Sequence, residues 1–103
     1  MMLYVFIHSL IGKIYKILPL KEESDAGRDV HWLGYVESLS RDMVGACSTF
    51  CELSVSPDYI TVLNILEYMQ VHEVDHRICK QEVFKMIRLL ENLEKQIGGD
   101  ACV

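Results

Sequence analysis

The stretch from Asp75 to Gly98 constrains the fold most, because it has the pattern of an amphipathic helix with a signal at each end. Its apolar residues are spaced alternately four and three apart, which places them on one narrow stripe of a helix. This stripe consists of Cys79, Val83, Met86, Leu90, Leu93 and Ile97. Asp75 is suited to accept a backbone N–H bond at the helix start, and Gly98 and Gly99 are suited to end the helix. The pattern therefore predicts a helix at 75–97 that packs against other helices.

One large side chain in this helix lies off the stripe. Phe84 is about 140° from the stripe centre at 100° per residue. Its neighbours on that side are Lys80, Arg88, Glu91 and Lys95. Because burial of a large aromatic ring is strongly favourable, we expect another segment of the chain to cover Phe84. The alternative is that Phe84 is an exposed anchor for a partner protein.

Two further helices are predicted before this one. Residues 29–54 carry the apolar stripe Trp32, Val36, Leu39, Met43, Ala46, Phe50 and Leu53. A second apolar line on the same helix, about 100° away, contains Leu33, Val44 and Cys51. Two apolar lines predict contacts with two neighbouring helices. The helix at 57–72 starts with Ser56 as its cap and Pro57 as its first residue. It is apolar on nearly every side, so we expect it to be buried between neighbours.

The first twenty residues predict an amphipathic helix at 1–18, with Leu3, Ile7, Leu10, Ile14 and Ile17 on its packed side. Lys13 and Lys16 follow the apolar run, whereas a signal peptide has its charges first. The uncharged stretch before Lys13 is also too short to span a bilayer. Pro19 is expected to end the helix near Leu18, and residues 19–28 are expected to form a loop. An interfacial membrane helix, a dimer contact and a short strand at 14–18 are the alternatives.

These segments together predict an all-α fold. We expect one domain, 1–103, that forms a small antiparallel helical bundle with three core helices at about 29–54, 57–72 and 75–97. The N-terminal amphipathic helix would be the fourth helix, and residues 98–103 would be a mobile tail. Half of the 103 residues are apolar, which is enough to build a core.

Charge and cysteine content narrow the class of protein. The formal net charge is −5, and the ten Lys and Arg residues are spread along the sequence, so no basic footprint for nucleic acid is evident. The four cysteines are Cys47, Cys51, Cys79 and Cys102. Three of them occur in apolar helical patterns, where cysteine behaves as a small apolar residue. This usage predicts reduced thiols and a cytoplasmic protein.

Only one group of residues suggests a metal site. His72, Asp75, His76 and Cys79 have helical spacing, and Cys47 and Cys51 could approach them in space. No Cys-x2-Cys pair is present. Residues 72–76 do read His-Glu-x-x-His, but this pair of histidines falls where a helix has to start, and Asp75 is better explained as a helix cap. We therefore expect no metal site. Cys79 lies on the packed stripe, where a thiol is inert, and the sequence contains no glycine-rich phosphate loop. No catalytic residue, enzyme activity or cofactor is expected.

The predicted function is that of a small non-enzymatic protein that binds another protein or itself, as an adaptor, an inhibitor or an immunity-type regulator. The apolar surface exceeds what a small bundle has to bury. We assign partner binding to Phe84, Arg88, Leu33 and Val44. The alternatives are a peripheral membrane protein held by residues 1–18, and a metal-binding or thiol-based sensor or enzyme that uses His72, His76 and the cysteines.

Overall fold

The structure, a computed structural model, describes residues 2–102, and it describes the side chains of residues 2–97. The helices are α1 (Met2–Tyr15), α2 (Ile17–Asp25), α3 (Trp32–Thr49), α4 (Pro57–Val71) and α5 (His76–Cys102), with a 3-10 turn, η1 (Cys51–Val55), between α3 and α4. No strand occurs between residues 2 and 102. The prediction of an all-α protein is therefore confirmed.

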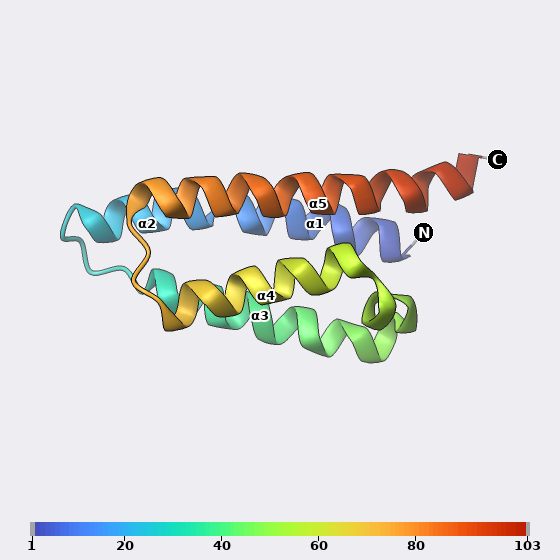
Figure 1. The fold of residues 1–103 in the computed structure, drawn as a ribbon, viewed down its shortest axis with the longest axis horizontal. Helices are drawn as coiled ribbons and strands as arrows, with labels where there is room; N and C mark the ends of the chain where they lie inside the picture. The colour runs from blue at the N-terminus through green and yellow to red at the C-terminus, as the bar shows by residue number, and fades with distance from the viewer. Residues whose placement is uncertain (1, 103) are drawn as a thin grey trace.

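The helices form two layers (Figure 1). In one layer α1 and α2 follow one another beside α5, and in the other layer α3 lies beside α4. The chain reverses direction between α2 and α3, between α3 and α4, and between α4 and α5. Helix α5 contacts α1, α2 and α4, so it belongs to one layer and also packs on the other.

The core lies between these helices and contains the apolar stripe of α5. Cys79, Val83, Met86 and Leu90 are fully buried, and Leu93 is nearly so. They share one core cluster with buried residues from every other helix. These include Ile7, Leu10 and Ile14 from α1, Ile17 from α2, Val36, Leu39 and Met43 from α3, and Val62, Leu66 and Met69 from α4.

The N-terminal region differs from its prediction in two ways. The chain breaks at Lys16 and then continues as α2, so the helix does not end at Leu18, and most of the predicted loop at 19–28 is helical. Pro19 is the third residue of α2, where a backbone N–H has no partner within the helix. The proline therefore interrupts the helix before it rather than the one that contains it. The alternative prediction of a short strand at 14–18 is also wrong, because these residues lie at the end of α1 and the start of α2.

Helix α3 is shorter than the predicted helix at 29–54. It begins at Trp32 and ends at Thr49, because Phe50 has φ −118° and ψ 88°, which are not helical values. The ring of Phe50 instead packs against Phe6 of α1, with 5.7 Å between the ring centroids. Leu53 in η1 is buried as well. The last apolar residues of the predicted stripe thus still reach the core, but through a tight turn that leads into α4.

Helix α4 is not covered on every side, which corrects another prediction. It packs on α3 and α5, and its remaining side faces solvent. Ile60, Tyr68 and Val71 are exposed on that side. Apolar residues all around a helix indicate burial only when neighbours are available on all sides, and the two-layer arrangement leaves α4 an outer face.

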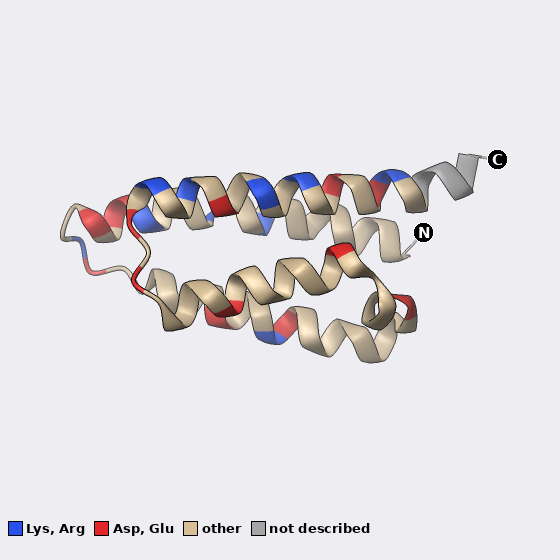
Figure 2. Ribbon diagram, viewed as in Figure 1, with Lys and Arg blue, Asp and Glu red and all other residues tan. Residues whose placement is uncertain are grey.

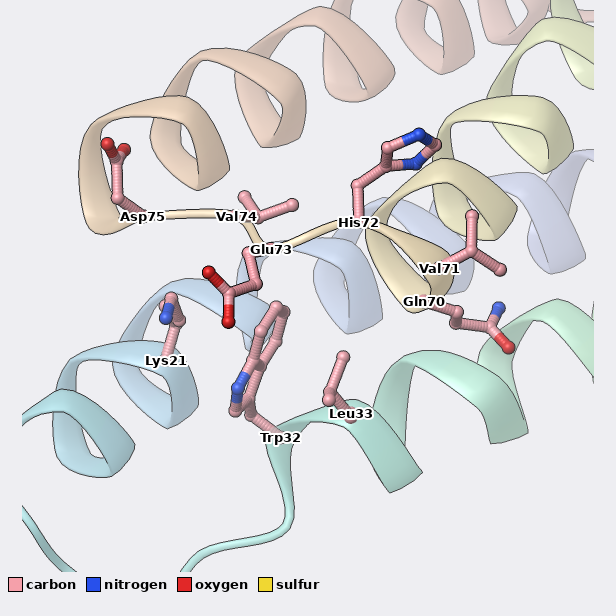
Figure 3. Close-up of a pocket in the computed structure, with 9 residues that line it drawn as sticks. All are labelled: Lys21, Trp32, Leu33, Gln70, Val71, His72, Glu73, Val74 and Asp75. Atoms are coloured by element: carbon pink, nitrogen blue, oxygen red, sulfur yellow. The ribbon is translucent and has the colours of Figure 1, made fainter.

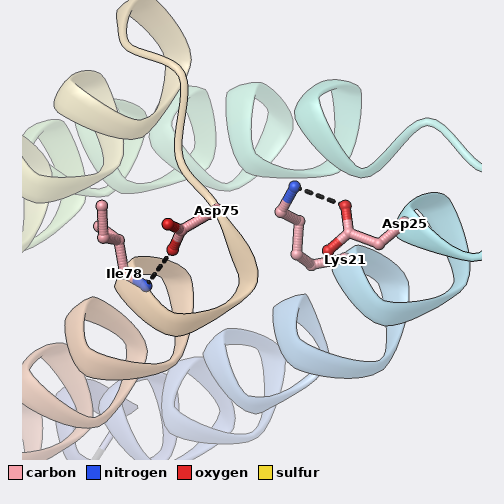
Figure 4. Close-up of polar contacts among 4 residues, drawn as sticks. All are labelled: Lys21, Asp25, Asp75 and Ile78. Atoms are coloured by element: carbon pink, nitrogen blue, oxygen red, sulfur yellow. Dashed lines mark hydrogen bonds and ion pairs between the residues drawn. The ribbon is translucent and has the colours of Figure 1, made fainter.

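The two predicted helix starts are confirmed. The Ser56 hydroxyl accepts a hydrogen bond from the backbone N–H of Tyr59 (3.4 Å), and Pro57 is the first residue of α4. The Asp75 carboxylate accepts one from the backbone N–H of Ile78 (2.8 Å; Figure 4). At its other end α5 extends to Cys102, beyond the predicted end at Gly98. The predicted mobile tail at 98–103 falls on residues whose side chains lie outside the described part of the chain.

A substitution in α1 tests how this helix packs. Ile7 is fully buried, so Ile7→Ala should lower the free energy of unfolding by about 2–4 kcal/mol. Val5 is 62% exposed on the same helix, and Val5→Ala should change the free energy by less than about 0.5 kcal/mol. Urea unfolding followed by circular dichroism measures both values. Equal effects of the two substitutions would contradict the packing of α1 on the core.

Candidate functional site

The α1–α5 side of the protein collects most of its basic residues (Figure 2). Seven of the ten Lys and Arg residues lie on α1, on α5 or at the break after α1: Lys13, Lys16, Arg77, Lys80, Lys85, Arg88 and Lys95. All seven are exposed, and none takes part in an ion pair among the described side chains. Basic residues that are spread along the sequence therefore lie in one layer of the fold once α1 lies beside α5.

The two layers differ in charge. In the layer of α1, α2 and α5, residues 2–25 and 76–97 contain eight Lys and Arg residues and six acidic residues, which gives a net charge of +2. Without α2, residues 2–16 and 76–97 contain seven cations and three acidic residues, a net charge of +4. Residues 32–71, which form α3, η1 and α4, contain five acidic residues and one arginine, which gives −4. The modest net charge of the whole chain is therefore the sum of a basic region on α1 and α5 and an acidic layer of α3 and α4.

The outward residues of α5 form a regular line that we call the α5 stripe: Arg77, Lys80, Phe84, Arg88, Glu91 and Lys95. Their spacings of three, four, four, three and four place them within a sector of about 80° on the helix surface. Phe84 lies in the middle of the stripe, with two basic residues before it and two after it. An exposed aromatic ring in a line of cations is the main surface feature of this helix.

Helix α1 completes this surface. The Tyr15 ring meets the Phe84 ring edge-on, with 6.2 Å between centroids and an interplanar angle of 82°. Farther along, His8 Nδ1 lies 2.8 Å from Glu94 Oε2, and Tyr4 stacks on the His8 ring. We call the α5 stripe together with Tyr4, His8 and Tyr15 the α1–α5 face.

The prediction that another segment covers Phe84 is only partly correct. Tyr15 covers one edge of the ring, but Phe84 remains 42% exposed and Tyr15 remains 46% exposed. The T-shaped contact holds both rings in a defined orientation and leaves aromatic surface open to solvent.

The four residues predicted to bind a partner do not form one surface. Phe84 and Arg88 lie together on the α5 stripe. Leu33 and Val44 are also exposed, but they lie on α3, in the other layer. Leu33 lies at one end of the protein, beside the exposed Val71 of α4 in the lining of a pocket (Figure 3).

This pocket has a volume of about 630 Å³ and lies where α2, the start of α3 and the α4–α5 connection meet. It is lined by Lys21, Trp32, Leu33, Gln70, Val71, His72, Glu73, Val74 and Asp75. The Lys21 side chain crosses the Trp32 ring, with its ammonium nitrogen 4.8 Å from the ring centroid. The same nitrogen lies 2.8 Å from an Asp25 carboxylate oxygen (Figure 4). Lys21 is only 8% exposed, and its charge is met within the protein by a carboxylate and an aromatic ring.

Sequence reasoning missed Lys21 because it placed this residue in a polar loop. The lysine is buried only because α2 continues through it and positions it over Trp32. A signal was available in the spacing of four between Lys21 and Asp25, which suits an ion pair on a helix. That signal has meaning only if the segment is helical.

The residues considered for metal binding are not arranged around a common point. His72 caps the end of α4 and stacks on Tyr68, with 4.2 Å between ring centroids. His76 is exposed at the start of α5, whereas Cys79 is fully buried. The described residues contain no group of three or more His, Cys, Asp or Glu side chains that could hold a metal ion.

Two buried groups have shifted pKa values. Burial raises the pKa of the Cys79 thiol to about 11, an effect that nearby Lys21 opposes and Asp25 reinforces. A thiol with a raised pKa is mostly protonated at neutral pH and therefore a poor nucleophile. Burial also raises the pKa of Tyr59, and nearby Cys47 raises it further by a smaller amount. The Tyr59 hydroxyl donates a hydrogen bond to the Met43 carbonyl oxygen at 2.6 Å.

The buried thiol predicts a pH effect on stability. In the unfolded chain the Cys79 thiol has its ordinary pKa of 9.0, whereas burial in the folded protein raises this pKa to about 11. Between these values the unfolded state binds fewer protons, so the free energy of unfolding falls as the pH rises, by at most about 1.4 kcal/mol per pH unit. Urea unfolding from pH 8 to 11 should show a smaller slope for Cys79→Ala than for the wild type. The exposed Cys51→Ala is the matched control, and an unchanged slope in Cys79→Ala would contradict this assignment.

The chain matches no protein-family model, no curated protein and no solved structure. A proposal of function therefore depends on the surfaces described above. Among them, the α1–α5 face combines exposed aromatic rings with charge that is not neutralised locally.

Proposed function

We propose that this chain is a non-enzymatic cytoplasmic protein that binds another protein through the α1–α5 face, as an adaptor, an inhibitor or an immunity-type regulator does. The proposal treats the fold as a small antiparallel helical bundle, with the α1–α5 face on its outside. The observation that supports it is the half-exposed Tyr15–Phe84 pair in a line of exposed cations. Aromatic and arginine side chains are enriched among the residues that contribute most to protein interfaces.

The aromatic pair is too small to provide affinity alone. Two half-exposed aromatic side chains leave on the order of 150–200 Å² to be buried, a gross gain of about 4 kcal/mol at 25 cal/mol per Å². A micromolar complex needs about 8 kcal/mol after the entropic costs of association. The flanking cations therefore have to contribute, both through contacts and by attracting the partner during the encounter.

Charge also bears on whether the partner is a second copy. A two-fold symmetric dimer places the same patch of both copies in contact. Through the α1–α5 face such a dimer would bring two surfaces of net charge +3 together, from Arg77, Lys80, Arg88 and Lys95 against Glu91. Like charges across an interface oppose association. The proposal therefore favours a different protein over a symmetric homodimer.

Phe84→Ser tests the proposed function. The substitution should reduce capture of the partner from a lysate of the native host at least tenfold, because it removes the central anchor. Quantitative mass spectrometry of the captured proteins, with native mass measurement of the complex, gives the readout. Val55→Ser is the matched control, since Val55 is an exposed apolar residue in η1, outside the α1–α5 face. Unchanged capture and unchanged self-association in a folded Phe84→Ser protein would refute the proposal.

The α3 residues can be tested in the same assay. Leu33→Ser and Val44→Ser should weaken capture only if the other layer carries a second contact with the partner.

A second candidate function is peripheral association with a membrane. Met2–Asp25, taken as one 24-residue segment, is long and apolar enough to cross a membrane by length and composition, and 22% of its most apolar window is buried. Met2 and Val5 are exposed at its N-terminal end. Core helices of soluble proteins and signal sequences meet the same criterion, and the packed stripe of α1 belongs to the core. This candidate therefore ranks second.

Flotation with vesicles tests the membrane candidate. A membrane function predicts that the full-length protein floats with phosphatidylcholine–phosphatidylserine vesicles and that Met2→Ser/Val5→Ser does not, because the variant loses exposed apolar side chains. This variant keeps the buried stripe of α1, which removal of residues 1–18 would destroy. If the full-length protein does not associate with lipid, the candidate is excluded.

A further inference from the structure

We infer that the partner of the α1–α5 face is an acidic amphipathic helix of another protein, which lies along the α5 stripe with an apolar residue on the Tyr15–Phe84 pair. This inference rests on the proposed function and specifies the chemistry of the partner.

The α5 stripe has the length and the side-chain spacing of a helix that could lie along it. The α5 stripe runs from Arg77 to Lys95, which is about 27 Å at 1.5 Å per residue. Its side chains repeat every three or four residues along one line. A second helix that packs at a shallow angle presents its own side chains at the same repeat. A helix of about 18 residues therefore matches the stripe in both length and spacing.

The order of charges along the α5 stripe specifies the charges that a partner helix needs. From the start of α5 the stripe reads basic, basic, Phe84, basic, acidic and basic. The complementary helix has acidic residues opposite Arg77, Lys80, Arg88 and Lys95, with an apolar residue opposite Phe84. Opposite Glu91 it has a basic or neutral residue.

The carboxylate of Glu91 favours a protein partner over a uniformly anionic ligand such as a phospholipid surface or a nucleic acid. A phospholipid surface or a nucleic-acid backbone would place negative charge against Glu91 as well as against the cations. Glu94, which contacts His8, adds a second carboxylate at the edge of the same face. A helix can carry a different residue at each of these positions, and such a mixed pattern is a means of choosing one partner over others.

A second copy of the chain does not supply this pattern from its acidic layer. On α4, Asp58 and Glu67 are nine residues apart, which places them about 180° apart around the helix. On α3, Glu37 already contacts Arg41, with 2.7 Å between Oε1 and the guanidinium nitrogen. Neither helix presents acids in a line with three- and four-residue spacing. The acidic helix therefore belongs to another protein.

Selection from a random library tests the inference without knowledge of the natural partner. The full-length protein is immobilised, and displayed linear peptides of 18 random residues are selected for binding. Enriched peptides should carry acids at three- and four-residue spacing around a central apolar residue, and they should become helical when bound. Binding should weaken several-fold when the salt concentration rises from 0.1 M to 1 M, where the screening length falls from about 10 Å to about 3 Å.

Charge reversal locates the bound peptide. Lys80→Glu/Arg88→Glu should weaken binding of the enriched peptides at least tenfold, and Phe84→Ser should do the same. Arg28→Glu/Arg41→Glu is the matched control, because it makes the same charge change at exposed arginines outside the α1–α5 face. A peptide in which only the acids opposite Lys80 and Arg88 are replaced by lysine should bind the Lys80→Glu/Arg88→Glu protein, which loss of folding could not produce.

Each other outcome would overturn the inference. These outcomes are no enrichment, enriched peptides without an acidic line, and binding that the Lys80/Arg88 reversal does not change. Flotation with phosphatidylserine vesicles that is lost in the reversal variant, without peptide enrichment, would identify a membrane as the ligand instead. Neutral peptides that depend on Phe84 would overturn the acidic helix but leave the proposed function intact. Capture from the host lysate that is unchanged by Phe84→Ser would refute the proposed function itself.

Discussion

Burial of one side of α5 is the constraint on which the rest of the structure depends. This side packs on α1 and α2 within its own layer and on α4 in the other layer. Because the buried stripe is narrow, three neighbouring helices are enough to cover it, and the opposite side of α5 remains in solvent. Measured around the helix axis, the centre of the α5 stripe lies about 40° from the direction opposite the buried apolar stripe. This offset brings Phe84 next to α1. The position of the Tyr15–Phe84 pair thus follows from how α5 is packed.

The separation of charge between the layers follows from the same arrangement. Helix α5 supplies five of the seven exposed cations in this layer, Lys13 lies in the last turn of α1, and Lys16 follows that helix directly. Lys21, in the next helix, does not join these exposed cations. Its stem covers apolar surface while its ammonium group meets Asp25 and the Trp32 ring, so it closes the end of the bundle between α2 and α3. Neighbouring lysines therefore have different roles, which depend on the helix and the side on which they lie.

Local signals predicted the local structure well. The stripe of α5, the Ser56 cap and the Asp75 cap depend on residues within one helical turn of each other, and all three are found. The errors occurred where a local signal has two outcomes. Pro19 ends a helix if its missing N–H lies in the interior, but it begins one if the helix restarts just before it. Phe50 continues an apolar stripe whether the backbone is helical or turned, and its packing on Phe6 decided the turn.

The sequence by itself determined which residues share a face on each helix, because the helical repeat sets their angles about the helix axis. It placed Phe84 away from the packed stripe and among charges. Only the tertiary structure decided what lies beside that face, because the repeat carries no information about where another helix packs. Once α1 lies against α5, Tyr15 supports Phe84 and seven separated cations lie in one layer. The same step placed Leu33 and Val44 in the other layer, away from Phe84.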